Sequence, residues 1–111
     1  MARFIHAGKT IDYTPTVDVT AGSVIVLGDL VCVANLDIPA NTLGALTIEG
    51  VFDFTKAAGV GTAIAVGTKL YWDVADQEAK ADDETGANKY IGKSVLAATD
   101  DDTTVRLKLD Q

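Results

Sequence analysis

The residues best suited to phosphate chemistry are Gly92, Lys93 and Ser94, at the end of a segment that begins at Gly86. In a phosphate-binding loop of the form G-x-x-x-x-G-K-[ST], successive backbone N–H groups surround one phosphate and the lysine reaches another. The first glycine of that motif falls on Ala87, and Gly86 lies one residue too far away. The segment also follows a polar run rather than a buried strand. We therefore expect a strand here and no nucleotide site.

Two acidic clusters could in principle hold a metal ion, Asp82 to Glu84 and Asp100 to Asp102. Calcium requires six to eight oxygen ligands, usually at alternating loop positions with a later bidentate carboxylate. Neither cluster has that spacing. Aspartates are also favoured residues of turns. We expect both clusters to form turns between strands, and no metal site.

The chain contains few residues of the types that could carry out catalysis. His6 is the sole histidine, no nucleophile elbow surrounds any serine, and Cys32 is the sole cysteine. Cys32 lies in an apolar run, where a buried and unreactive thiol is expected. We predict that the protein is not an enzyme and has no catalytic residues and no cofactor.

The length and composition limit the kinds of protein that this chain can be. The chain has 111 residues, 48% of them hydrophobic, a formal net charge of −7, and no long apolar run or leader-like opening. This size predicts a single domain over residues 1–111. The lack of a leader-like opening and of a long apolar run predicts a protein that is made in the cytoplasm and is not in a membrane. The negative charge disfavours direct nucleic-acid binding, which needs clustered basic residues. A local basic patch created by folding stays open, although the basic residues are scattered from Arg3 to Lys108.

The hydrophobic pattern is that of β-strands throughout. It predicts an all-β protein with little helix, a small β-barrel or sandwich of short, mostly antiparallel strands. The expected strands are 4–7 paired with 11–13, 23–27 paired with 30–34 through Gly28-Asp29, a long strand or strand pair over 43–54, and strands at 69–74, 90–96 and 104–109. Residues 55–66 are expected to form a loop. The run from Ala21 to Val26 also parallels the run from Val66 to Tyr71, which suggests internal pseudo-symmetry.

Tyr71 and Trp72 are adjacent on an expected strand, so their side chains must point to opposite faces. One of them is expected in the core. The other is then exposed or at a subunit contact, since both residue types are enriched at interfaces.

Turn and strand segments along most of the chain carry a family resemblance: Phe4-Ile5, Ile11 to Pro15, Gly22 to Asp29, Leu43 to Leu46, Gly50 to Phe52, Gly67 to Asp73, Tyr90 to Gly92 and Val105 to Leu107. Together they resemble the capsid cement or head decoration proteins of tailed phages, a family often mislabelled as RecA-like recombinases. None of these segments is a catalytic signature.

The resemblance implies a structural virion protein, encoded by a phage or prophage, that binds the outer surface of the mature capsid. It would stabilise contacts between major capsid subunits, often as a homotrimer. The candidate contact residues are Arg3, Phe4, Ile5 and His6, in an interface arm formed by residues 1–8, together with Tyr71 and Trp72. The alternatives are a head-completion or tail component and a nucleotide-dependent recombination protein.

Overall fold

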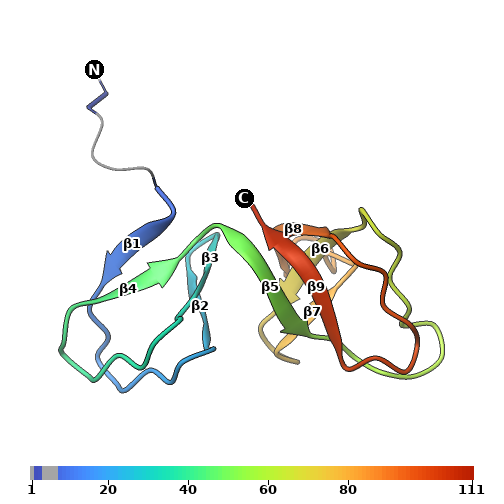
Figure 1. Ribbon diagram of the computed structural model, residues 1–111, viewed down its shortest axis with the longest axis horizontal. Coiled ribbons are helices and arrows are strands. Elements are labelled where there is room, and N and C mark those ends of the chain that lie inside the picture. The colour runs from blue at the N-terminus through green and yellow to red at the C-terminus, as the bar shows by residue number, and fades with distance from the viewer. Residues whose placement is uncertain (1, 4–7) are drawn as a thin grey trace.

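The computed structural model describes residues 2–3 and 8–111, and in them it contains nine strands and no helix (Figure 1). The strands form two antiparallel sheets in a sandwich-like arrangement, which confirms the all-β prediction. They are β1 Thr10–Tyr13, β2 Val24–Leu27, β3 Leu30–Val33, β4 Gly44–Thr47, β5 Gly50–Thr55, β6 Lys69–Asp73, β7 Glu78–Lys80, β8 Lys89–Ser94 and β9 Thr104–Leu109.

The N-terminal sheet has the strand order β1-β4-β3-β2. β2 and β3 form the hairpin that the sequence predicts, with Leu27 opposite Leu30 and Gly28 at a φ of 62° in the two-residue turn. β1 pairs with β4 over four residues. The strand predicted at residues 4–7 lies outside the described residues.

The C-terminal sheet has the strand order β5-β9-β8-β6-β7. β9 alternates as predicted, with Val105, Leu107 and Leu109 buried and the residues between them exposed. Residues 43–54, predicted as a long strand or a strand pair, form a pair of strands that belong to different sheets. Along the chain, β4 is the last strand of the N-terminal sheet and β5 is the first strand of the C-terminal sheet. Gly50, with a φ of 143°, starts β5 at this change of sheet.

The two sheets repeat one topology, since β5-β9-β8-β6 follows the order of β1-β4-β3-β2. The glycine turns noted in the sequence are equivalent: the Gly22 N–H donates to the carbonyl of Ala34 at 2.6 Å, and the Gly67 N–H donates to the carbonyl of Ser94 at 2.9 Å. The predicted internal echo is therefore a repeat of the whole four-stranded unit. The repeated units are two sheets joined in sequence.

The two sheets share part of their core. Val31 and Val33 of β3 pack into the cluster formed by the inner side chains of the C-terminal sheet. The side-chain amide of Gln111 accepts from the N–H of Val31 and donates to its carbonyl, each at 2.7 Å. An ion pair of 2.8 Å between Lys89 and Asp29 adds a further link. A second cluster, around Cys32 and Leu46, belongs to the N-terminal sheet.

Candidate functional site

The Gly92-Lys93-Ser94 segment lies in β8, as a strand and not as a phosphate-binding loop. Gly92 has a φ of 149° beside a register shift, and a Cβ atom there would lie 1.8 Å from the carbonyl oxygen of Lys108. The Ser94 hydroxyl donates to the carbonyl of Ala65 at 2.6 Å and accepts from the N–H of Thr68 at 3.0 Å. The glycine and the serine therefore serve strand pairing and turn formation.

Both acidic clusters lie in turns, as predicted. Asp100 accepts from the N–H of Ala63, and Asp102 accepts from the N–H of Thr99, each at 2.8 Å. In the other cluster, Asp82 accepts from the N–H of Glu84 at 2.9 Å. Across residues 2–3 and 8–111, no three His, Cys, Asp or Glu side chains are grouped as metal ligands. The carboxylates that bond to backbone N–H groups hold loops together.

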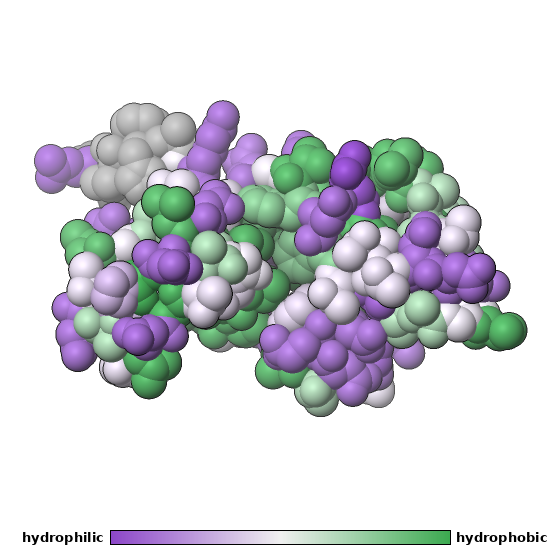
Figure 2. Space-filling view, turned by 60° about the horizontal axis from the view of Figure 1, so that its bottom comes forward, coloured by the Kyte–Doolittle hydropathy of each residue, from purple (hydrophilic) through white to green (hydrophobic). Residues whose placement is uncertain are grey.

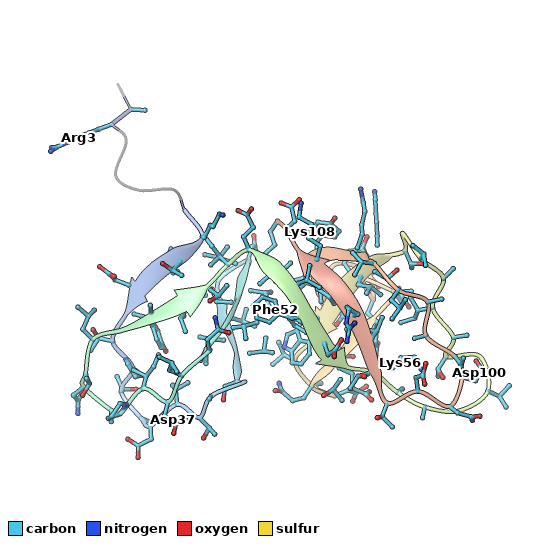
Figure 3. The ribbon with its side chains drawn as sticks, in the orientation of Figure 1. Arg3, Asp37, Phe52, Lys56, Asp100 and Lys108 are labelled. Atoms are coloured by element: carbon cyan, nitrogen blue, oxygen red, sulfur yellow. The ribbon has the colours of Figure 1, made fainter. Side chains whose placement is uncertain are left out.

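Lys56 is a buried lysine that the sequence analysis did not single out. Its side chain is 3% exposed, and its ammonium donates to the carbonyls of Ala57, Thr99 and Asp102 at 2.7–3.0 Å. The hydroxyl oxygen of Thr62 is a fourth acceptor at 3.3 Å, so it shares one of the three ammonium hydrogens with a carbonyl. These bonds tie the loop after β5 to the loop before β9. Figure 3 shows Lys56 at the end of β5 near this pair of loops.

Of the N-terminal candidates, Phe4, Ile5 and His6 lie outside the described residues. Arg3 is exposed and points away from both sheets (Figure 3). Cys32 is fully buried as expected, and burial raises the pKa of its thiol, which keeps the thiol protonated.

Tyr71 and Trp72 face opposite sides of β6, as predicted. Trp72 is 3% exposed and packs edge-on against Phe54, with ring centroids 5.6 Å apart, so it offers almost no surface to a partner. Tyr71 lies on the outer face, half-buried, with the ring of Tyr90 opposite it at 5.8 Å. Tyr71 is thus the member of the pair that a partner can reach.

The outer face of the C-terminal sheet also carries a row of three exposed lysines. Lys69 lies opposite Lys93, and Lys93 lies opposite Lys108, so the row crosses β6, β8 and β9. We call these three residues the lysine row. The sequence analysis missed it because the three positions are far apart in the chain and only the strand register brings them together.

Asp73 and Lys80 form an ion pair of 2.8 Å on the same sheet, and Lys80 also contacts Asp76. The hydrogen bond from Lys80 holds the pKa of Asp73 below its ordinary value. The pair therefore stabilises the fold above the ordinary pKa of about 4, and this contribution is lost as the pH falls through the lowered pKa.

Asp73→Asn should lower the Tm at pH 7, and this effect should shrink between pH 7 and about pH 2 as the wild-type carboxylate takes up a proton. Thermal melts of both proteins across this range test the expectation. Asp101→Asn, at an exposed turn position, serves as the control. An equal loss of Tm at both pH values would show that the ion pair does not contribute.

A cleft of about 410 Å³ separates the two sheets. Val24 and Val33 line it on one side, and Phe52, Phe54 and Trp72 line it on the other. Phe52 lies on the side of the C-terminal sheet that faces the N-terminal sheet (Figure 3). The indole Nε1 of Trp72 is buried without a hydrogen-bond partner, the one such side-chain atom in the described part of the chain. Ser23, Asp53 and Gln77 also line the cleft, and Asp53 is paired with Arg106.

On the face shown in Figure 2, exposed apolar residues do not form a single surface. Figure 2 shows them in several separate patches with hydrophilic residues between them. They come from loops and strand ends of both sheets, for example Leu36 at 75% exposed and Val66 at 62%. A partner on this face would therefore meet a mixed surface.

The family model of the phage cement proteins matches residues 5–109, nearly the whole chain. The chain belongs to the phage cement protein family. A cement protein is a structural, non-enzymatic protein, so the role of this chain is to stabilise a phage capsid, and its place is in the capsid of the virion. This assignment confirms the resemblance and rejects the recombination alternative.

Further comparisons add no relatives to the family assignment. Neither the curated proteins nor the solved structures gave a match to this cement protein. Within the described residues, no helix has the length and hydropathy required to cross a membrane.

Proposed function

We propose that this cement protein binds the outer surface of the mature capsid and stabilises contacts between neighbouring major capsid subunits, as a homotrimer. The family match over residues 5–109 is the observation that carries the proposal. A protein that binds only the expanded lattice shifts the equilibrium toward that lattice by mass action. Many copies on one shell then add their separate contributions.

The proposal takes residues 1–111 as one β domain with an interface arm at residues 1–8. A shared core between the two sheets supports the single domain. The arm is rich in apolar residues, Phe4 and Ile5 among them, and such a segment can add to the edge of a neighbour's sheet through main-chain hydrogen bonds. Tyr71 is the second contact candidate, on the outer face of the C-terminal sheet.

Deletion of residues 2–6 tests the arm. The truncated protein should keep the Tm of the full chain, because an interface arm adds to a neighbour's sheet and not to the core of its own domain. It should fail to bind expanded capsids that lack the cement protein. Co-sedimentation of capsids with the full-length and the truncated protein measures the difference. Unchanged binding by a folded, truncated protein would reject the arm as a contact.

A further inference from the structure

The lysine row is a concentration of positive charge in an acidic protein. The chain has a net charge of −7, yet three of its nine basic residues stand in direct cross-strand register. Directly opposed side chains in a sheet have Cβ atoms about 5 Å apart, and like charges at that spacing destabilise the pairing. Repulsion within the lysine row therefore lowers the stability of the folded protein.

The strand register by itself does not place lysines at these positions. In the repeated topology, the row Lys108, Lys93, Lys69 corresponds to Thr47, Val33 and Val24 of the N-terminal sheet, which stand in the same cross-strand register. Val33 and Val24 lie against the shared core, whereas the three lysines are exposed on the outer face of their sheet. The three lysines thus distinguish the C-terminal sheet from its repeat.

The charges of the row are largely uncompensated. Lys108 approaches Asp110 at 3.8 Å, with both side chains more than half exposed. Within residues 2–3 and 8–111, Lys69 and Lys93 have no ion-pair partner, whereas the neighbouring Arg106 is paired with Asp53 at 3.0 Å. Figure 3 shows Lys108 at the end of β9 on this side of the molecule. The row is free to meet an anionic partner.

We propose that the lysine row binds carboxylate side chains on the surface of the major capsid protein, an inference that rests on the proposed capsid binding. Charge complementarity selects such a partner, because a compact group of carboxylates matches three adjacent ammonium groups. A long polyanion such as DNA would extend beyond the row over the acidic remainder of the protein and be repelled. Tyr71 and Tyr90, on the same face, border the row and add contact area.

The test compares Lys69→Gln, Lys93→Gln and the double variant with Lys9→Gln, which removes the same charge from an exposed position before β1. Each protein is titrated onto expanded capsids that lack the cement protein. Each single substitution in the row should weaken binding by about 5-fold, the double variant should weaken it further, and Lys9→Gln should not. The Tm of the row variants should stay equal or rise, because repulsion within the row is relieved.

Several outcomes separate the two proposals. If the wild-type protein binds capsids and the row variants bind equally well, the lysine row is not a contact and the capsid-binding proposal stands. If the wild-type protein binds no capsids, the capsid-binding proposal itself fails. A fall in Tm for Lys93→Gln would give the row a structural role, and tight binding of duplex DNA that depends on the row would make the partner a nucleic acid. Either result overturns the assignment to capsid carboxylates.

Discussion

Gly92→Ala should destabilise the protein by about 3–5 kcal/mol, because it combines a severe overlap with backbone strain. The new Cβ atom would lie 1.8 Å from the carbonyl oxygen of Lys108, in the backbone of the neighbouring strand. The backbone at residue 92 also has a positive φ of 149°, which side chains rarely permit. Because β8 is in the middle of its sheet, a displacement there disturbs its pairing with both β9 and β6. Denaturant unfolding measures the loss.

Gly86→Ala is the matched control for that substitution. Gly86 has a φ of 91°, and a Cβ atom built there meets nothing within 4 Å. Its replacement carries only the conformational penalty, about 1 kcal/mol. Equal losses for the two variants would show that the sheet yields at residue 92 and that the close approach of β9 is not a constraint.

Lys56→Met should destabilise the protein by about 2–4 kcal/mol, even though it replaces a charge with an apolar side chain of similar length. The methionine removes the donor from three backbone carbonyls and from the hydroxyl of Thr62. Those oxygens lie around a 3% exposed side chain, so water replaces the lost bonds poorly. The loops at residues 57–64 and 99–103 should then become more sensitive to proteolysis.

Lys69→Met serves as the control for the buried lysine, since Lys69 is exposed on β6. Its unfolding free energy should stay within about 0.5 kcal/mol of the wild type. If Lys56→Met is as stable as Lys69→Met, the ammonium does not hold the loops together.

The strands could be predicted from the sequence because their signals are local. The alternation of Val105, Leu107 and Leu109 and the Gly28-Asp29 turn each depend on a few adjacent residues, and both appear in the structure as expected. The assignment of strands to sheets depends on distant partners. For that reason the sequence left open whether residues 43–54 form one strand or two, and did not show that the chain changes sheet at Gly50.

The candidate surfaces were harder to predict from the sequence, because they also depend on residues that are distant in the chain. Lys69, Lys93 and Lys108 appear in the sequence as isolated surface lysines, and only their register makes them one row. Lys56 is followed by two alanines in a glycine-containing loop, and nothing nearby in the sequence signals that its ammonium is enclosed by carbonyls from residues 99 and 102. In the pair Tyr71-Trp72, alternation required opposite faces, but tertiary packing decided that the tryptophan is buried.

The most direct test of the central claim is the copy number of this protein in purified mature phage particles, measured by quantitative mass spectrometry against the major capsid protein. A cement protein that binds throughout the lattice should occur in a copy number comparable to that of the capsid subunits. A few copies per particle would contradict the account and place the protein in a head-completion or tail structure. Its absence from the particles would reject a role in the virion.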